Sequence, residues 1–473
     1  MKENPYRKDS EDIKELLQQF LNLKNGRTHR FMSEDSFEQL IEYFDELEDY
    51  PQALEAAELG TEHFPFSATL QFKKADLLIA NRKYQEALEV LEKAELLDSK
   101  DINLYILKTD VYLALDEQEK AVLLLQNALY LFEGDEKVDL LFELADVYDD
   151  YEEFDKIFDC LKLILEQEPT NEEALYKICF WTDFTGRNEE SIRLHQQIID
   201  EYPYSELAWF NLASAYQGLK LFEKAIDAYQ YAITIDEKFD YAYRNMGDAY
   251  IRLRKYKDAI EVLEKVNELS RPEDVIFEAI GHCYDKLKNY AQARFNYRKA
   301  LHLNQTDSKL YYKIATTYMN EESWQQAIKQ LEQALQIYRK NHEYNLAIGE
   351  CYLKLGKNKE AIQYFSAVVS ASPKNTAGWE ALIRCLYVCE YYEEANEQVQ
   401  AALLHTRNKP LFMFYKSAVL FALGKAKEAL LQLEKAMAKS PRLIKNFVAL
   451  KPAILQNQQV VDLVARYKKN KNI

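Results

Sequence analysis

The chain has 473 residues, of which 48% are hydrophobic and 29% are charged. This composition supplies enough apolar material to bury a continuous core, so it excludes disorder as the global state. The 11 glycines and 10 prolines are few for this length, and a scarcity of chain-breaking residues favours helices joined by short turns. The sequence therefore predicts an all-α fold.

The net charge of −18 is distributed unevenly along the chain. Residues 1–200 carry 21 Lys and Arg against 47 Asp and Glu, whereas residues 201–473 carry 39 against 31. A strongly acidic half repels nucleic acid and attracts basic partners. Binding of RNA is thus disfavoured, and the C-terminal KKNKNI could add only weak, nonspecific contacts to it.

The sequence contains no membrane or secretion signal. No apolar run approaches the roughly 18 residues of a membrane span, and MKENPYRKDSEDIKEL lacks the apolar core of a signal peptide. The six cysteines do not have the dense, regular spacing of a disulfide framework. We expect a cytoplasmic protein with reduced thiols and no membrane partner.

The first segment, residues 1–33, predicts a capping helix followed by a linker. In DSEDIKELLQQFLNL, Ser10 is a candidate N-cap, and NGRTHR is the expected linker. The apolar face of this helix comprises Ile13, Leu16, Leu17, Phe20 and Leu21. We expect that face to pack on the element that follows.

A small residue then returns at a fixed interval along most of the chain. The alanine at 225 recurs every 34 residues at Ala259, Ala293, Ala327, Ala361, Ala395 and Ala429. In the other direction the same phase reaches Ser191 and Ile157 and then, after a two-residue slip near Gly134, Ala121, Ala87 and Ala53. This phase defines twelve units that begin at residues 34, 68, 102, 138, 172, 206, 240, 274, 308, 342, 376 and 410 and end near 443. Repeats of this length predict stacked structural units rather than separate domains.

Each unit reads as two helices of about 12 to 15 residues separated by a polar break. Alanine at position twenty and a small residue at position eight would let the two helices approach closely. Tyrosine recurs at position eleven, where its large side chain is expected to pack against the next unit. Five prolines fall at position thirty-two, where proline ends a helix, and glycine marks the break in three units. These glycines are Gly186, Gly356 and Gly424.

These residues resemble the tetratricopeptide repeat, whose signature is W-x2-L-G-x2-Y, then A-x3-F, then A and P in 34 residues. The unit at 206 matches it with Trp209, Leu212, Ala213, Tyr216, Ala225, Tyr229 and Ala232. The match covers residues 34–443 and is weakest in the units at 138, 172 and 410. The resemblance implies a right-handed α-solenoid in which the first helix of each unit lines a concave groove. Residues 444–473 are then expected to form a C-terminal capping helix with a basic tail.

No enzymatic or metal-binding motif occurs in the sequence. The P-loop, dinucleotide, zinc-protease and hydrolase patterns are all absent. Cys385 and Cys389 lie one helical turn apart, but Cys283, Cys351 and Cys385 share position ten of their units, which indicates core packing. We therefore expect no catalysis, no cofactor and no metal.

In this family the groove is lined mainly by positions 2, 5, 6, 9, 12 and 13 of each unit. In the acidic half, the candidate groove residues at these positions are Asp110, Asp146, Asp149, Asp150 and Asp183. Carboxylates gathered in one cleft focus their field on a basic ligand. The alternative is a solvated acidic surface with no binding role.

Near the middle of the chain the same positions become aromatic and amphipathic. The candidates there are Tyr176, Phe180, Phe210, Asn211, Ser214, Gln217, Tyr241, Arg244, Asn245 and Asp248. Exposed aromatic residues with a polar handle are common interface anchors. Asn211 and Asn245 share position six, where an asparagine ladder in long superhelices of this family holds an extended peptide. Alternatively, these aromatic residues pack only against each other.

The sequence thus predicts a non-enzymatic scaffold that binds a basic or extended peptide or protein in its groove. A second hypothesis is self-assembly, in which the acidic half of one molecule meets the basic half of another or of the next superhelical turn. The identity of the partner and the oligomeric state stay open.

Overall fold

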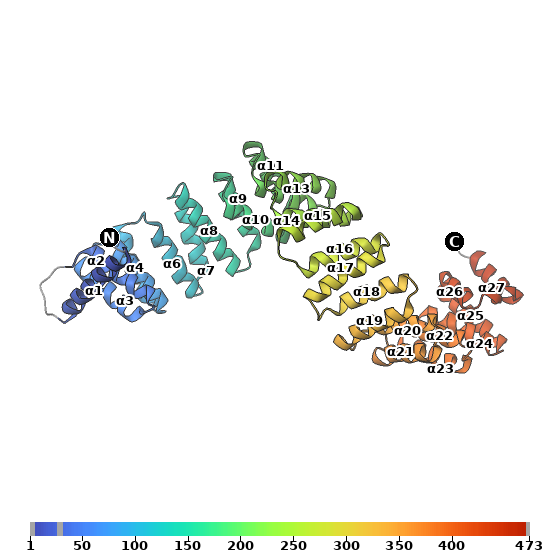
Figure 1. Ribbon diagram of the computed structural model, residues 1–473. Coiled ribbons are helices and arrows are strands. Elements are labelled where there is room, and N and C mark those ends of the chain that lie inside the picture. Colours follow the sequence, from blue (N-terminus) through green and yellow to red (C-terminus); the bar gives the residue numbers. More distant parts are fainter. Residues whose placement is uncertain (1–4, 26–31, 470–473) are drawn as a thin grey trace. The chain divides into compact units, whose positions relative to one another are not determined.

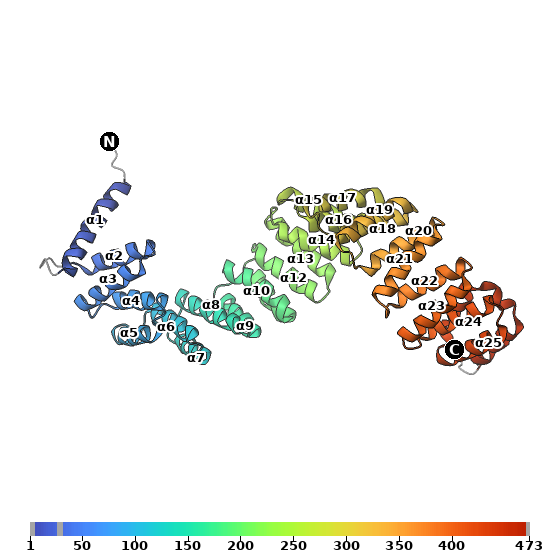
Figure 2. The ribbon, with the colours of Figure 1, turned by 90° about the horizontal axis from the view of Figure 1, so that it is seen from below.

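The computed structural model describes residues 5–25 and 32–469, and within them it contains 27 α-helices, two short 3-10 helices and no strand. The chain divides into two compact units, one up to Ala242 and one from Tyr243 onward, which are described separately (Figures 1 and 2). None of the described helices is long and apolar enough to cross a bilayer.

In the first compact unit the helices follow one another as antiparallel hairpins. They are α1 (Pro5–Lys24), α2 (Glu34–Glu46), α3 (Tyr50–His63), α4 (Ala68–Ala80), α5 (Tyr84–Leu97), α6 (Ile102–Ala114), α7 (Gln118–Ala128), α8 (Asp135–Asp150), α9 (Phe154–Gln167), α10 (Glu172–Thr185), α11 (Asn188–Glu201), α12 (Glu206–Gly218) and α13 (Phe222–Ile235). The division between the compact units falls within α14 (Asp240–Arg252).

The second compact unit continues the same pattern to the C-terminal helices. They are α15 (Tyr256–Leu269), α16 (Asp274–Lys286), α17 (Tyr290–Leu303), α18 (Ser308–Asn320), α19 (Trp324–Ile337), α20 (His342–Lys354), α21 (Asn358–Ala371), α22 (Thr376–Val388), α23 (Tyr392–His405), α24 (Pro410–Ala422), α25 (Ala426–Lys439), η1 (Pro441–Leu443), α26 (Ile444–Leu450), η2 (Pro452–Gln456) and α27 (Gln458–Lys469). The fold is an all-α solenoid of tandem helical hairpins, as predicted.

Even-numbered helices from α2 to α24 are the first helices of the hairpins, and all but one begin at position one of the 34-residue phase. The exception is α8, which begins at Asp135, three residues before position one. It directly follows Gly134, whose φ of 63° turns the chain into the helix early. The slip in the period therefore corresponds to one extended first helix.

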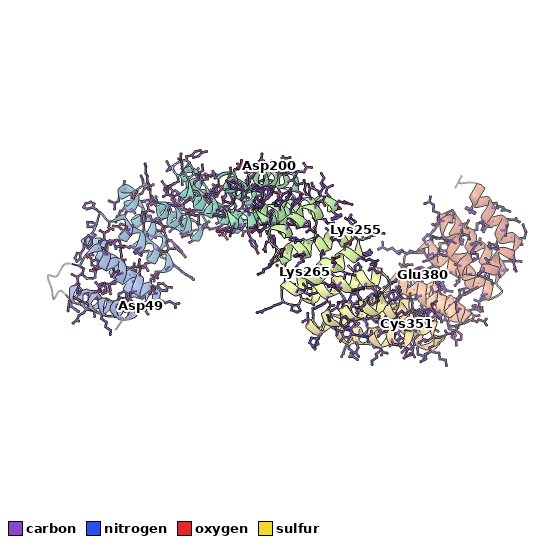
Figure 3. The ribbon with its side chains drawn as sticks, turned by 45° about the horizontal axis from the view of Figure 1, so that its top comes forward. Asp49, Asp200, Lys255, Lys265, Cys351 and Glu380 are labelled. Atoms are coloured by element: carbon purple, nitrogen blue, oxygen red, sulfur yellow. The ribbon has the colours of Figure 1, made fainter. Side chains whose placement is uncertain are left out.

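Short polar side chains start most first helices. In eight hairpins the N-cap side chain accepts a hydrogen bond from a free backbone N–H of the first turn, which stabilises the helix start. The caps are Ser33, Ser67, Asp101, Asn171, Ser205, Asp307, Asn341 and Asn375. Asp49, which is labelled in Figure 3, accepts from the backbone N–H of Gln52 and so caps the second helix α3 in the same way.

Every hairpin turns through one residue in the left-handed conformation at position fifteen, where φ lies between 57° and 76°. Three of these residues are the glycines predicted to mark the break. The other nine are Glu48, Arg82, Asp116, Glu152, Lys220, Arg254, Lys288, Glu322 and Glu390. A side chain in this conformation costs about 1 to 2 kcal/mol, which glycine avoids.

We expect Lys220→Gly to raise the free energy of unfolding by about 0.5 to 1 kcal/mol, because relief of the left-handed strain exceeds the entropy that glycine loses. Gly186→Ala should lower it by about 1 kcal/mol, since nothing lies within 4 Å of a Cβ there and only backbone strain remains. Urea unfolding followed by circular dichroism measures both. Lys220→Ala keeps the strain and is the control. A loss of stability in Lys220→Gly would contradict this account of the turn.

Small residues hold the two helices of a hairpin together. Every alanine at position twenty is fully buried. At position eight, a Cβ on Gly247, Gly281 or Gly349 would come within 2.4 to 2.7 Å of the large side chain at position twenty-four of the same hairpin. The predicted close-contact role of positions eight and twenty is confirmed.

The terminal helices pack on the neighbouring hairpins. Phe20 is buried, and its ring lies 6.0 Å from that of Phe44 in the first hairpin. The prediction that Ser10 is an N-cap was wrong, because α1 begins at Pro5 and Ser10 lies inside it. Residues 5–9 thus extend the helix by more than a turn beyond the predicted start. At the C-terminal end, Phe447 and Val460 are buried in the core of the last hairpins. Within the predicted linker and basic tail, residues 26–31 and 470–473 lie outside the described residues.

Candidate functional site

Positions 2, 5, 6, 9, 12 and 13 of the first helices share one side of each helix, which we call the first-helix face. First helices of neighbouring hairpins contact each other directly, as α4 does α6, α6 does α8 and α10 does α12. Between α4 and α6 a hollow of about 280 Å³ is lined by residues at these positions, among them Lys73 and Asp76. The first helices thus adjoin one another from α4 to α8 and again from α10 to α12, and Nζ of Lys177 on α10 lies 5.0 Å from the ring centroid of Phe142 on α8.

A carboxylate occupies position nine in four successive hairpins, at Glu42, Asp76, Asp110 and Asp146. Partial burial raises the pKa of Asp76, and the charge of Asp45 raises it further. Burial raises the pKa of Asp110 as well, followed by the charge of Asp76 one hairpin away. Asp76 and Asp110 thus interact from one hairpin to the next, and we call the four position-nine carboxylates the acidic row.

Glu143 strengthens the acidic row and was missed by the sequence prediction. It lies on α8, at position six of the repeat unit that begins at residue 138, and is half-buried. Burial raises its pKa to about 7, and the charges of Asp110, Asp146 and Asp150 add to the shift. The repeat phase alone would have found this residue, because position six belongs to the predicted groove.

We expect Glu143→Gln to stabilise the protein above pH 7 by about 1 kcal/mol, after allowance for solvent screening. The pKa of Glu143 is raised from 4.5 to about 7. The neutral form of Glu143 therefore stabilises the folded state fully below pH 4.5, and this contribution is lost as the pH rises through 7. Glutamine keeps the neutral form at every pH. Hydrogen exchange of the α8 amides between pH 5 and pH 8 measures the difference, and equal protection of both proteins at pH 8 would contradict it.

Two lysines partly neutralise the first-helix face, one on α4 and one on α10, on either side of α6 and α8. Lys73 Nζ lies 2.8 Å from Glu42 Oε1, and Lys177 Nζ lies 2.8 Å from Glu173 Oε1. Lys177 also lowers the pKa of Asp146 against the larger effect of burial. The field is therefore least compensated around Asp110 and Glu143.

The predicted carboxylates are all exposed: Asp110, Asp146, Asp149, Asp150 and Asp183. They lie on α6, α8 and α10, three neighbouring first helices. Each of these predicted residues is thus accessible to solvent.

Exposed aromatic rings continue the face on α10. Tyr176 and Phe180 are 71% and 60% exposed. Phe180 also contacts Trp181 and Phe184, with ring centroids 4.9 and 6.0 Å apart, so these rings pack together and still remain accessible. Phe184, at position thirteen, is 57% exposed and was missed by the prediction, although its position belongs to the predicted groove.

Asn211 is not available to a ligand, which corrects its prediction as a peptide-binding rung. It is only 2% exposed. Its Nδ2 donates to the carbonyl of Leu175 at 2.6 Å and lies 3.2 Å from Nε2 of the fully buried His195. Burial lowers the pKa of His195 to about 4, so the ring is neutral and can accept this bond. The asparagine therefore joins α10, α11 and α12 structurally.

The remaining predicted residues differ in accessibility. Tyr241 is 55% exposed, whereas Phe210, Ser214, Gln217, Arg244, Asn245 and Asp248 are half-buried. Arg244 forms a bidentate pair with Glu273, with both N–O distances 2.8 Å, and this pair lowers the pKa of Glu273. Asp248 accepts from Arg252. Arg244 and Asp248 are thus already engaged within the protein.

The cysteines lie where the repeat phase predicted core packing. Cys283, Cys351 and Cys385 are buried, and burial raises the pKa of each thiol to about 12. Thiols with such pKa values are poor nucleophiles and poor metal ligands at neutral pH. Among the residues that the structure describes, no group of three or more His, Cys, Asp or Glu side chains is arranged to hold a metal.

The repeat architecture agrees with the family models that match this chain. Residues 159–345 match the tetratricopeptide repeat protein 21 C-terminal ARM domain, and residues 39–101 and 342–375 each match a tetratricopeptide repeat model. The chain is a tetratricopeptide repeat protein. A tetratricopeptide repeat array is a protein–protein interaction scaffold, and the fold is typically non-enzymatic.

Several solved tetratricopeptide repeat structures are similar to parts of this protein. YrrB, described as a TPR protein with an unusual peptide-binding site, is 19% identical over 40% of this chain and 96% of its own, with a TM-score of 0.35. A chain of the APC/C hetero-tetramer Cut9–Hcn1 is 13% identical over 85% and 98%, with a TM-score of 0.33. The C-terminal part of a TPR protein from Cytophaga hutchinsonii is 17% identical over 54% and 99%, with a TM-score of 0.44. No protein with a curated description matches the chain.

Proposed function

We propose that this tetratricopeptide repeat protein binds a basic, extended segment of a protein partner on the first-helix face of α2 to α12. The observation that carries the proposal is the acidic row, in which one carboxylate per hairpin recurs at position nine in four successive hairpins. An extended chain with regularly spaced cations could contact one carboxylate after another.

The strongest attraction is expected at α6 and α8. There burial and the charge of Asp110 raise the pKa of Glu143, while the lysines of the face pair with Glu42 and Glu173 instead. Neutralising a pair of mutually repelling carboxylates by a bound cation releases that repulsion. Binding at this place is thus worth more than binding to one isolated surface carboxylate.

The excess of acidic residues in the first 200 residues supplies the long-range part of the attraction. A field of one sign over a wide surface speeds the encounter with a basic partner more than it raises the final affinity. Tyr176, Phe180 and Phe184 on α10 then provide apolar contact area beside the carboxylates. We therefore expect the partner segment to carry an apolar or aromatic side chain near its cationic run.

The test is a titration of the full chain with a fluorescent twelve-residue peptide that alternates lysine with alanine and contains one phenylalanine. Changing Asp110, Asp146, Asp149 and Asp150 to Asn should weaken binding at least tenfold and flatten its salt dependence. The control variant replaces four exposed acidic residues of second helices by their amides, so that its net charge changes by the same amount. These residues are Glu89, Glu92, Glu119 and Asp155. Equal weakening in both proteins would mean that total charge, and not the first-helix face, is responsible.

The uneven charge also supports a second candidate function, self-assembly of the acidic part of one molecule with the basic part of another. Such heterologous contacts would give open head-to-tail chains. Light scattering between 50 mM and 1 M salt should then show a falling mass as screening increases. A constant mass would exclude it.

A cytoplasmic location is part of the proposal. The six cysteines are all unpaired and lie buried or half-buried, as thiols do in a reducing compartment. Fractionation of cells that express the tagged chain would test it.

A further inference from the structure

The second helices form a recurring kind of pocket with the position-eleven tyrosine of a first helix. One such pocket, of about 490 Å³, lies between α11, α12 and α13, and another, of about 720 Å³, lies between α7, α8 and α9. In the first, Gln196 donates to the hydroxyl of Tyr216 at 3.1 Å; in the second, Gln126 donates to that of Tyr148 at 3.2 Å. The two pockets are thus equivalent parts of the repeat.

A lysine covers the tyrosine ring in both pockets. Lys224 Nζ lies 5.4 Å from the ring centroid of Tyr216, and Lys156 Nζ lies 4.8 Å from that of Tyr148. These shared contacts belong to the architecture. What differs between the pockets indicates what one of them can bind.

The α11–α13 pocket has aromatic walls that its equivalent lacks. Trp209 and Tyr231 stand where the other pocket has Leu141 and Leu163. The two rings stack with centroids 4.4 Å apart and planes 23° apart, and Tyr231 is still 57% exposed. The indole N–H of Trp209 donates to the carbonyl of Pro203, which fixes the ring. The pocket therefore presents a rigid, accessible aromatic surface.

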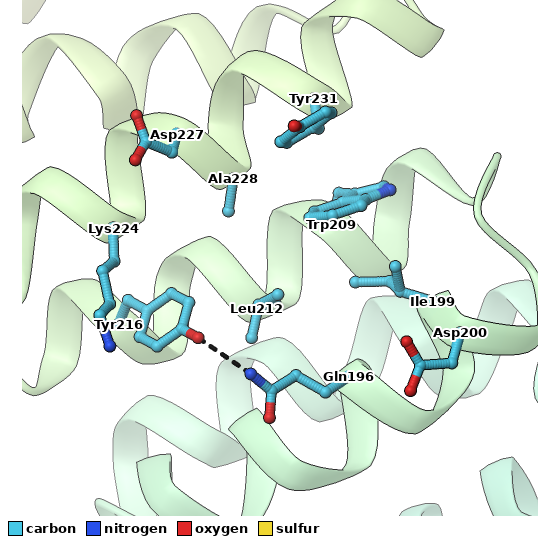
Figure 4. Close-up of a pocket in the computed structure, with 10 residues that line it drawn as sticks. All are labelled: Gln196, Ile199, Asp200, Trp209, Leu212, Tyr216, Lys224, Asp227, Ala228 and Tyr231. Carbon is cyan, nitrogen blue, oxygen red and sulfur yellow. Dashed lines mark hydrogen bonds between the residues drawn. The ribbon is translucent and has the colours of Figure 1, made fainter.

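The charges of the two pockets differ as well. The α11–α13 pocket contains Asp200 and Asp227, and neither forms an ion pair with any residue in the described part of the chain. In the equivalent pocket, Asp159 pairs with Arg187 at 2.7 Å, and Tyr130 stands in the place of Asp200. Figure 4 shows Asp200 and Asp227 on opposite sides of the stacked rings. Two uncompensated carboxylates thus flank the aromatic surface, against the single cation of Lys224.

This pocket is separate from the first-helix face. It uses Trp209, Leu212 and Tyr216 of α12, whereas the face uses Phe210, Ser214 and Gln217. With 100° of rotation per residue, these two sets point to opposite sides of the helix. Binding at the pocket therefore does not depend on the proposed function of the first-helix face.

We infer that the α11–α13 pocket binds an arginine side chain of a protein partner. A planar guanidinium stacks on aromatic faces and donates paired hydrogen bonds to a carboxylate. The apolar floor of Ile199, Leu212 and Ala228 suits the methylene stem of arginine. A lysine ammonium would gain the charge attraction but not the stacking, and an anion would meet two carboxylates.

The test is isothermal titration calorimetry of the full chain with the peptide acetyl-Ala-Arg-Ala-Arg-Ala-amide. The matched peptides carry citrulline, which is uncharged and nearly isosteric, or lysine at both places. We expect the arginine peptide to bind at least tenfold more tightly than the citrulline peptide and more tightly than the lysine peptide. Equal affinities for arginine and citrulline, or for arginine and lysine, would overturn the inference.

Two variants locate the binding. Asp200→Asn with Asp227→Asn should remove the tenfold preference for arginine. Trp209→Leu with Tyr231→Leu should weaken the arginine peptide while preserving the fold, because leucines fill the same places in the α7–α9 pocket. Changing Asp110, Asp146, Asp149 and Asp150 to Asn should leave the preference for arginine over lysine unchanged. Loss of the preference only in this last variant would assign it to the first-helix face and contradict the inference.

Discussion

Gly349→Val is expected to lower the free energy of unfolding by about 3 kcal/mol, near the upper end of what overpacking a core costs. A Cβ at this position would lie 2.4 Å from Cε1 and 2.8 Å from Cδ1 of Phe365, which is itself buried. Valine adds two further methyl groups at the same contact. The ring cannot turn away without opening the hairpin between α20 and α21. Urea unfolding with far-ultraviolet circular dichroism would measure the loss.

The chain offers a matched rescue for this substitution. The preceding hairpin combines Ala315 at position eight with Leu331 at position twenty-four, and both are fully buried. The double variant Gly349→Ala with Phe365→Leu reproduces that pair and should recover most of the stability. If Gly349→Val were as stable as the unchanged protein, the close approach of α20 and α21 would be wrong.

Asn211→Ala should cost about 2 to 3 kcal/mol, because it leaves the Leu175 carbonyl and the buried His195 ring without their donor and opens a small cavity. The bond from Asn211 to Leu175 is 2.6 Å long and links the first helices of two neighbouring hairpins. The effect is therefore expected on stability and only indirectly on binding. Thermal unfolding and peptide titration of the same variant separate the two.

Asn245 provides the control, because it occupies the same position six one hairpin later and is only half-buried. Asn245→Ala should change the free energy of unfolding by well under about 1 kcal/mol, as for a partly exposed polar side chain. Equal losses in the two variants would show that position six, and not the contact with His195, determines the cost.

The fold could be predicted from sequence because the architectural residues repeat in one phase. Ten of the twelve hairpins have a fully buried alanine at position twenty, and most have a small residue at position eight and a tyrosine at position eleven. A pattern repeated in one phase along twelve units leaves little freedom for another topology. The helix start at Asp135 was not predicted, because the φ of Gly134 is a local property that the phase does not contain.

The candidate site could be predicted only in part. The exposed carboxylates follow from position alone, and Glu143 and Phe184 would have followed if every predicted groove position had been counted. Asn211 and Asn245, in contrast, have the same residue type and the same position. Their difference comes from His195 on the preceding second helix, which reaches Asn211 across the space between hairpins. A contact of that kind is not encoded in the periodicity of one helix.

Trp209 illustrates a second limit of the repeat phase. Its match to the tetratricopeptide signature explains why a large residue stands at position four, and its indole bond to Pro203 serves the architecture. The phase does not indicate that Tyr231 stacks on it, or that Asp200 and Asp227 beside it form no ion pair with the residues that the structure describes. Contacts shared by the equivalent pockets belong to the repeat, whereas the contacts that differ are added by a single hairpin.

We propose that the acidic row of the first-helix face binds a basic, extended segment. The most direct measurement is photo-crosslinking of the full chain with the lysine- and phenylalanine-containing peptide, carrying a benzophenone at one end, followed by mapping of the crosslinked residues by mass spectrometry. We predict crosslinks on the first helices α6, α8 and α10, lost when Asp110, Asp146, Asp149 and Asp150 are Asn. Crosslinks confined to second helices, or unchanged in that variant, would contradict the claim.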